Sequence, residues 1–437
     1  MTAAAPSEQL SPPRQSRDWA IAGIVLAHFA LALTTSFFML LGYAPDEPRH
    51  FAYVRWLAQH HSFPPPDERL SGGAHSLHPP LYYVLMLPVY WAFSSLGDAA
   101  AMRAMRCVAP FFGVAALCLL VPVVRKAMAG RRGMTLFTLS LIAFWPQLLV
   151  CVAMVNNDAA AVLMSALLVN VVLVQRWDSR VSSAALWGAV LGLASLAKFS
   201  NFLAGGPTVA VALAIAHGKH FYRREEFWKA GFLAAVCCLA VCGWWWVRNL
   251  LVYGAVNPYP AIPILPPGLT PLEAVLSGHA WRLFLRALNG LWASTWPAID
   301  WAPAGLLPAI LLLLRLVTVL ALAGALVWLW RLARRPITLT RDQMAAVLAP
   351  AAGYAAMFLA LLYVATFKHA GTYRNGRYLM PFVAGLAITM GLALEQICPP
   401  RLRPWAAGAL VVFFLALTAA GWFHLATYWN PLILSQK

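Results

Sequence analysis

The fold class is set by residues 19–42, whose sequence is WAIAGIVLAHFALALTTSFFMLLG. This run carries no charged residue and exceeds the roughly 20 residues that a helix needs to cross a bilayer. It is also longer than the apolar core of a signal peptide, about 7–15 residues, and no small-x-small cleavage site follows it. We therefore predict a retained first membrane helix, and Arg14 and Arg17 in front of it predict a cytoplasmic N-terminus.

Similar apolar runs recur along the whole chain of 437 residues, of which 61% are hydrophobic and only 11% charged. Ordinary soluble domains have roughly 45–50% apolar residues, and the mean hydropathy here is +0.69. Because the runs lack the alternating pattern of a membrane barrel, we expect an all-α polytopic membrane protein. It should have about 11 transmembrane helices of roughly 20 residues each. The expected spans are 19–42, 107–124, 134–155, 159–175, 182–197, 202–216, 230–252, 304–330, 343–366, 378–397 and 405–427.

Basic residues gather in four short connections between these runs, near residues 125–132, 219–229, 331–341 and 401–403. Cytoplasmic loops are rich in Lys and Arg, so the net charge of +17 indicates membrane orientation and not a nucleic-acid partner. If residues 1–18 and the first basic connection both lie inside, an even number of crossings separates them. The apolar segment 79–97, which contains Pro88, is therefore expected to be re-entrant or interfacial.

The predicted organisation is one membrane domain over residues 19–428. Residues 1–18 should be a disordered cytoplasmic N-terminus and 429–437 a short outer tail. The outer face should carry the loops 43–106, 253–303 and 367–377. In the first loop, Phe51, Val54 and Leu57 have helical spacing, which predicts an interfacial helix. In the second, Thr270 and Glu273 form a capping box that predicts a helix of about 20 residues.

Asp46 and Glu47 are adjacent carboxylates in Tyr43-Ala44-Pro45-Asp46-Glu47-Pro48-Arg49-His50, directly after the first span. A carboxylate pair where a membrane helix meets water, with His50 nearby, suits a general base or a possible divalent metal. The alternative is a helix N-cap with a solvated charge. A second polar stretch with His78 and Tyr82, His75-Ser76-Leu77-His78-Pro79-Pro80-Leu81-Tyr82-Tyr83, falls on the same outer face.

Four further sites of charge are expected on that face. Asp158 opens a helix, which it could simply cap, and Lys198 lies in a tight turn, where snorkelling to the interface is the alternative. Arg374, Arg377 and Tyr378 lie in a segment that is basic on the face where basic residues are depleted, which indicates an anion site. Arg248 points the same way, although it could be an ordinary interfacial anchor.

A carboxylate and a cationic anion site at one membrane surface suit group transfer from a lipid-linked phosphate. The sequence has neither a GxxxxGK(S/T) phosphate loop nor a GxGxxG fingerprint to seat a nucleotide. The rival hypothesis is a transporter or flippase for a lipid-linked or anionic solute. A transporter predicts inverted repeats and ionisable residues spread through the membrane depth, and neither is evident in the sequence.

The order of these motifs resembles that of the GT-C superfamily of polytopic glycosyltransferases, which includes the protein O-mannosyltransferases and the lipid A aminoarabinose transferase. The resemblance spans about residues 20–400. It rests on Pro45-Asp46-Glu47-Pro48-Arg49-His50, on His78-Pro79-Pro80-Leu81-Tyr82-Tyr83, on the Asn157-Asp158 helix start, on the turn ending at Lys198 and on Asn375-Gly376-Arg377-Tyr378-Leu379-Met380-Pro381.

The resemblance implies an inverting glycosyltransferase of the bacterial inner membrane, active on the periplasmic side with a polyprenyl-phosphate sugar as donor. Asp46 would be the catalytic base, and Glu47 would orient the acceptor or help to bind a metal. The acceptor would be a glycan, a lipid or a protein hydroxyl. The implied substrate-binding residues are His50, His78, Tyr82, Asp158, Lys198, Arg248, Arg374, Arg377 and Tyr378.

Overall fold

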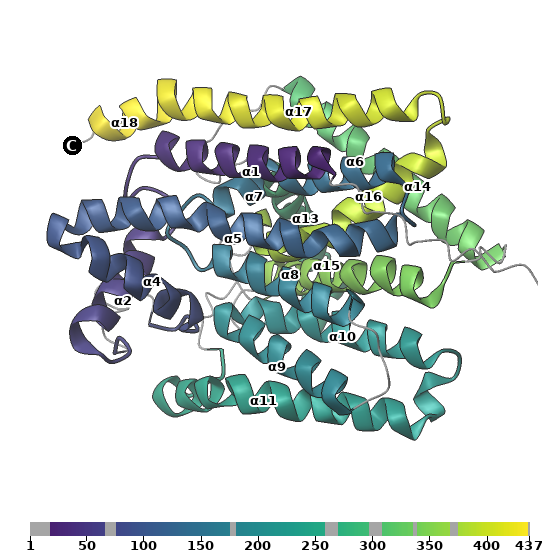
Figure 1. Ribbon diagram of the computed structural model, residues 1–437, viewed down its shortest axis with the longest axis horizontal. Coiled ribbons are helices and arrows are strands. Elements are labelled where there is room, and N and C mark those ends of the chain that lie inside the picture. The colour runs from purple at the N-terminus through teal and green to yellow at the C-terminus, as the bar shows by residue number, and fades with distance from the viewer. Residues whose placement is uncertain are drawn as a thin grey trace, which may run out of the picture.

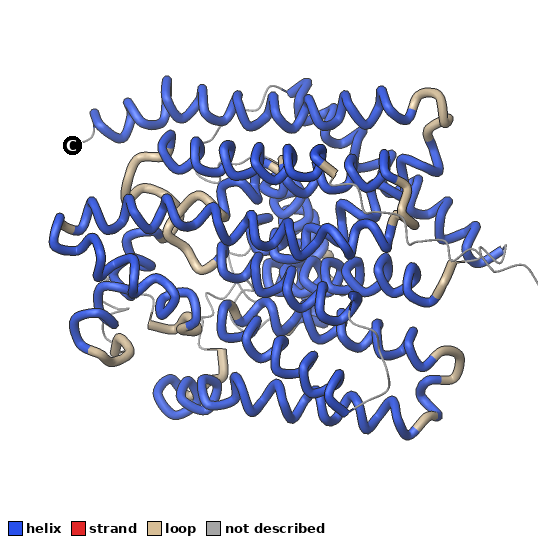
Figure 2. The backbone as a smooth tube through the Cα atoms, in the orientation of Figure 1, coloured by secondary structure: helices blue, strands red, loops and turns tan. Residues whose placement is uncertain are grey.

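The structure is a computed structural model that describes residues 18–65, 76–174, 181–257, 270–296, 308–334, 339–367 and 375–435. Over these ranges the chain is a bundle of helices joined by loops, with no strand (Figure 2). Eight helices in the described ranges are long and apolar enough to cross a membrane, as expected for a multi-pass membrane protein. They are α1 (Trp19–Phe38), α5 (Asp98–Ala127), α10 (Phe199–His217), α11 (Glu225–Tyr253), α14 (Pro308–Arg334), α15 (Arg341–Phe367), η3 with α16 (Gly376–Phe382 and Val383–Ile397) and α17 (Arg403–His424).

The three remaining expected spans correspond to shorter helices. The predicted runs 159–175 and 182–197 form α8 (Asp158–Val174) and α9 (Val181–Ala197), each of 17 residues. The prediction of one span over 134–155 is wrong, because the run divides into α6 (Arg132–Ala143) and α7 (Pro146–Cys151). Pro146 lacks the N–H that a continuous helix would need, and Trp145 before it is extended (ψ 116°).

The predicted outer loop 43–106 is largely helical. It contains α2 (Glu47–His60), α4 (Leu81–Phe93) with the 3₁₀ turn η1 (Ser94–Leu96), and the first turns of α5. The helix expected from Phe51, Val54 and Leu57 is confirmed as α2, and all three side chains are buried. α4 has 13 residues, or about 20 Å of helix, which is shorter than the roughly 30 Å hydrocarbon core. Its expected position at the interface stays a prediction.

The capping box in the second predicted loop is confirmed, since the Thr270 side chain accepts from the Glu273 N–H at the start of α12 (Pro271–Leu276). The expected single helix of about 20 residues is nevertheless wrong. Gly278 has φ 72° and separates α12 from α13 (His279–Thr295), because a left-handed residue cannot continue a right-handed helix. α13 packs on the bundle through Leu283, Ala287 and Leu291.

Close helix packing depends on small residues, as between α9 and α11. A Cβ built on Gly188 would lie 2.1 Å from the Ala234 carbonyl oxygen, and one on Gly192 would lie 2.8 Å from the Cys238 carbonyl oxygen. Glycines four apart allow this approach in membrane helices. In Figure 1 the long helices run side by side from α17 to α11, and α2 and α4 gather at one end of the bundle. The remaining short elements are η2 (Phe221–Arg223), the π-helical η4 (Leu425–Trp429) and α18 (Asn430–Ser435).

Candidate functional site

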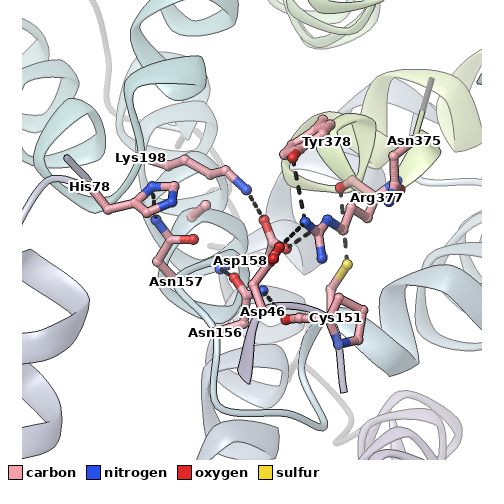
Figure 3. A network of polar contacts seen from close by, with 12 residues as sticks. Asp46, His78, Cys151, Asn156, Asn157, Asp158, Lys198, Asn375, Arg377 and Tyr378 are labelled. Atoms are coloured by element: carbon pink, nitrogen blue, oxygen red, sulfur yellow. Dashed lines mark hydrogen bonds and ion pairs between the residues drawn. The ribbon is translucent and has the colours of Figure 1, made fainter. Parts of the chain in front are cut away.

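The site lies where the ends of several helices meet (Figure 3). Asp46 stands at the start of α2, Asp158 at the start of α8 and Lys198 in the turn between α9 and α10. Arg377 and Tyr378 come from η3, far along the chain. Polar side chains at helix ends can reach one another without disrupting the backbone hydrogen bonds of the bundle.

Asp46 occupies the N-cap position of α2 but makes no side-chain capping hydrogen bond. Its backbone is left-handed (φ 57°), which is uncommon outside glycine and tolerated by Asp. The side chain accepts a 2.7 Å hydrogen bond from Nη2 of Arg377 and is 39% exposed. The capping alternative therefore does not hold for this side chain, which instead combines a buried cationic partner with access from outside.

Asp158 is fully buried and lies between two cations. One of its oxygens forms an ion pair with Lys198, and the other lies 3.9 Å from Nε of Arg377. Lys198 is itself only 9% exposed in its side chain, so it does not snorkel to the surface. Its Nζ lies 4.5 Å from the centre of the Tyr378 ring, where a cation–π contact adds to the pair.

Arg377 is held in place by its neighbours in the Asn-Gly-Arg-Tyr motif. The Asn375 side chain accepts from the Arg377 backbone N–H at 2.9 Å, and the Gly376 N–H donates to the Ser294 hydroxyl of α13 at 2.7 Å. A Cβ at Gly376 would lie 2.5 Å from the backbone of Thr295, so only glycine fits here. The Arg377 side chain is only 8% exposed, yet its Nη1 has no hydrogen-bond partner among the described residues.

A cavity of about 320 Å³ adjoins this cluster. Its polar lining includes His78, Lys198, Asn249 and Tyr378. It also has an apolar wall that comes mainly from α10 and α15. The residues of that wall are Phe199, Leu203, Met357, Ala360, Leu361 and Val364. A pocket that combines an apolar wall with a lysine in its lining matches an amphipathic ligand with an anionic head.

The two histidines of the predicted site lie together. The ring centres of His50 and His78 are 5.3 Å apart. His50 Nδ1 is 2.8 Å from the Tyr83 hydroxyl, and His78 Nδ1 is 3.3 Å from the amide nitrogen of Asn157. Asn157 precedes Asp158, so His78 adjoins the charged cluster (Figure 3), and His50 lies beside His78.

Glu47 points away from Asp46 into a separate, fully buried ion pair with Arg106 of α5. It accepts from Nε of Arg106 at 2.6 Å and from the backbone N–H groups of Gly42 and Val155 at 2.8 and 3.1 Å. The neighbouring carboxylates thus pair with different arginines. In the described part of the chain no group of three or more His, Cys, Asp or Glu is placed to hold a metal.

Arg106 also donates to three carbonyl oxygens in the last turn of α1 and directly after it. The distances are 2.8 Å to Ser36, 2.6 Å to Met39 and 2.8 Å to Leu40. The Arg106–Glu47 pair therefore fixes the loop that carries Asp46. Sequence reasoning missed Arg106, although an arginine beside an apolar run on the predicted outer face was the available signal.

Arg248 and Tyr82 take no part in the ion pairs of the cluster among the described residues. The Arg248 guanidinium lies 4.6 Å from the Trp245 ring centre and 5.5 Å from that of Phe63, as the anchor alternative expects. Tyr82 is fully buried and is not among the residues that line the cavity. Arg374 lies outside the described residues.

No family model and no curated protein matches the sequence. Solved structures do match. ArnT from Cupriavidus metallidurans bound to undecaprenyl phosphate is 15% identical over 93% of this chain and 64% of its own, with a TM-score of 0.52. The Archaeoglobus fulgidus oligosaccharyltransferase in complex with Zn and sulfate is 15% identical over 94% of this chain and 53% of its own, with a TM-score of 0.56.

A further structure of the archaeal oligosaccharyltransferase AglB from Archaeoglobus fulgidus, in complex with an inhibitory peptide and a dolichol-phosphate, has a TM-score of 0.52 at 15% identity. It matches 96% of this chain and 55% of its own. This chain therefore spans between about half and two thirds of the length of the proteins that it matches. The fold is GT-C-like, as the sequence motifs predicted.

Proposed function

We propose that this protein is a glycosyltransferase that moves a sugar from a polyprenyl-phosphate donor to a hydroxyl acceptor. The observation that carries the proposal is a continuous charged cluster beside a cavity with an apolar wall. The cluster is formed by Asp46, Arg377, Asp158 and Lys198. The GT-C-like fold, shared with a protein bound to undecaprenyl phosphate, supports the same function by analogy.

The donor would bind with its phosphate beside the polar residues that line the cavity. Lys198 and Tyr378 are two of these, and Nη1 of Arg377, the residue before Tyr378, is a buried donor with no hydrogen-bond partner among the described residues. The first isoprene units would follow the apolar wall, where Leu203 is 41% exposed and offers a route towards lipid. Cations near the phosphate stabilise the negative charge that develops on it when the bond to the sugar breaks.

Asp46 would act as the general base. Its carboxylate takes the proton of the acceptor hydroxyl while the hydroxyl oxygen forms a bond to the anomeric carbon. The bond between that carbon and the phosphate oxygen breaks, and its electron pair leaves with the polyprenyl phosphate. Attack from the face opposite to the leaving group inverts the anomeric centre. The partial exposure of Asp46 supports this role, since an acceptor must reach it.

Glu47 is proposed as a positioning residue in place of the catalytic role first assigned to it. Its oxygens already accept from Arg106, Gly42 and Val155 and it is fully buried, so no acceptor can approach it. Through Arg106 it fixes the loop between α1 and α2. His50 and His78 are proposed to border the donor phosphate from the side of α4.

The acceptor is proposed to be a glycan or a lipid-linked saccharide, with a protein hydroxyl as the less favoured class. Ser294 of α13 accepts a hydrogen bond from Gly376, next to Arg377. The predicted outer loop 253–303, which contains α13, is therefore suited to recognise the acceptor. We propose that the N-terminus lies in the cytoplasm and the site on the opposite face of the membrane, which the distribution of basic residues supports. The resemblance to GT-C enzymes implies that this face is the periplasmic side of a bacterial inner membrane.

Reconstitution tests the proposal. The purified protein in liposomes is given a labelled polyprenyl-phosphate sugar and candidate saccharide acceptors, and the products are separated by chromatography. A glycosyltransferase yields a new glycosidic bond and free polyprenyl phosphate. A transporter or flippase moves the labelled lipid between leaflets and returns it chemically unchanged, which would contradict the proposal.

A further inference from the structure

Arg315 is a charged residue on the exposed surface of a helix that can cross a membrane. It lies in α14 and is exposed. Leu312 and Val319 lie one turn before and one turn after it on the same side of the helix, and both are exposed. An exposed apolar face of a membrane helix is in contact with lipid. A charged side chain on such a face is costly unless an anion or water solvates it.

The length of α14 places Arg315 near one surface of the membrane. About 24 Å of helix separates it from Arg331, which lies in the basic last turn of α14. The hydrocarbon core of a bilayer is about 30 Å thick. With Arg331 at one boundary of this core, Arg315 lies about one helical turn inside the opposite boundary. An arginine side chain can extend over such a distance, so its guanidinium reaches the depth of the lipid phosphates.

A tryptophan of α13 stands beside this arginine. The guanidinium carbon of Arg315 lies 5.6 Å from the centre of the Trp292 ring, where a cation–π contact is favourable. The indole N–H of Trp292 donates to the Thr318 hydroxyl of α14 at 2.8 Å, which fixes the ring. Tryptophan is enriched where a membrane meets water, in agreement with the depth derived for Arg315.

We infer that Arg315 and Trp292 form a binding site for the phosphate of a phospholipid, in the leaflet opposite to Arg331. A guanidinium matches phosphate oxygens with parallel hydrogen bonds, and Leu312 and Val319 are placed to contact the acyl chains. The lipid is a phospholipid of the bilayer and not the donor. Neither Arg315 nor Trp292 is among the described residues that line the donor cavity, and a lipid-facing site meets phospholipid in excess.

This lipid would brace the helix that adjoins the catalytic cluster. Ser294 follows Trp292 closely on α13 and accepts a 2.7 Å hydrogen bond from the Gly376 N–H, next to Arg377. A lipid bound to both Arg315 and Trp292 would hold α13 against α14 and so limit the movement of Ser294. The binding site itself does not depend on the proposed sugar transfer.

The test uses phosphatidylglycerol with a photoreactive group near its phosphate, and diacylglycerol with the same group and the same acyl chains. Each is added below saturation to the delipidated full-length protein in detergent, and adducts on α14 are quantified by peptide mass spectrometry after illumination. The variants are Arg315→Leu and, as the matched control, Arg223→Leu. Arg223 is also exposed, and its guanidinium carbon lies 5.6 Å from the Tyr222 ring centre, but it belongs to η2. Each variant is first checked for a monodisperse elution profile and a cooperative thermal transition.

Arg315→Leu should reduce the phosphatidylglycerol adduct on α14 about fivefold, or about 1 kcal/mol. The diacylglycerol adduct should stay within about twofold of the wild type, and Arg223→Leu should leave both adducts unchanged. An equal loss for the two lipids, an equal loss in Arg223→Leu, or no loss in Arg315→Leu overturns the inference. Unlabelled polyprenyl phosphate that displaces the adduct at lower concentration than unlabelled phosphatidylglycerol also overturns it, because the site would then belong to the donor. None of these outcomes decides whether the protein transfers sugar.

Discussion

Asp46 and Arg377 are 331 positions apart in the chain and are joined by a hydrogen bond of 2.7 Å. The bond links the first loop after α1 to a short 3₁₀ segment near the end of the bundle. The side chain of Arg377 is 8% exposed and that of Asp46 39% exposed. The pair therefore lies at a boundary, with the cation inside the protein and the carboxylate partly exposed.

Arg377→Lys should reduce kcat/KM for sugar transfer by about 10²–10³-fold, even though the positive charge is kept. A lysine ammonium cannot donate two parallel hydrogen bonds from one planar edge as a guanidinium does. Removal of one oriented donor to a developing oxyanion costs about that factor. Steady-state kinetics with a labelled donor would check this. Activity of Arg377→Lys within about threefold of the wild type would mean that the two-bond geometry of the guanidinium is not needed for transfer.

Gly376→Ala should reduce transfer activity more than tenfold and lower the midpoint of thermal unfolding. The new Cβ would lie 2.5 Å from the backbone of Thr295, so η3 must move and carry Arg377 with it. Gly231→Ala is the matched control, because nothing lies within 4 Å of its Cβ position inside α11. Ala favours a helix by about 1 kcal/mol over Gly. Equal behaviour of the two variants would contradict the close approach of α13.

Glu47→Gln should destabilise the protein by about 3–5 kcal/mol, because it leaves the fully buried Arg106 without its counter-charge. Thermal or denaturant unfolding in detergent would measure the loss. Asp98→Asn breaks a pair whose side chains are 44% and 50% exposed, and it should cost about 0–1 kcal/mol. If both variants were equally stable, Glu47 would not anchor the loop.

Ala360→Phe should raise KM for a long-chain donor, since a phenyl ring at this position of the apolar wall would fill part of the cavity. The effect should shrink for a donor whose lipid is shortened to a few isoprene units. Ala355→Phe on the same helix is the control, because Ala355 is exposed and does not line the cavity. An effect that does not depend on the length of the lipid would count against this placement of the donor.

The membrane helices and much of the cluster could be predicted from sequence, for a physical reason. Apolar length alone determines whether a helix can span a bilayer, and basic residues in the connections indicate which helix ends share a face. Asp46, Asp158, Lys198 and Arg377 could thus be grouped without knowledge of any distance. Pro146 was a sequence signal for a helix break. The continuous apolar run on both sides of it nevertheless suggested one long helix in place of α6 and α7.

The different partners of Asp46 and Glu47 could not be predicted in this way. The two carboxylates are adjacent in sequence, and only the tertiary positions of Arg377 and Arg106 distinguish them. Arg248 illustrates the same limit, since its aromatic neighbours include Phe63 of a distant segment. The direction of a side chain depends on partners that sequence spacing does not locate.

The central claim is that Asp46 is the base for sugar transfer. The most direct test compares Asp46→Asn with the wild type in proteoliposomes that contain a polyprenyl-phosphate sugar and an acceptor. Loss of a general base predicts a fall in kcat of about 10²–10⁴-fold, while polyprenyl phosphate still binds. Transfer by Asp46→Asn at the wild-type rate would contradict the account.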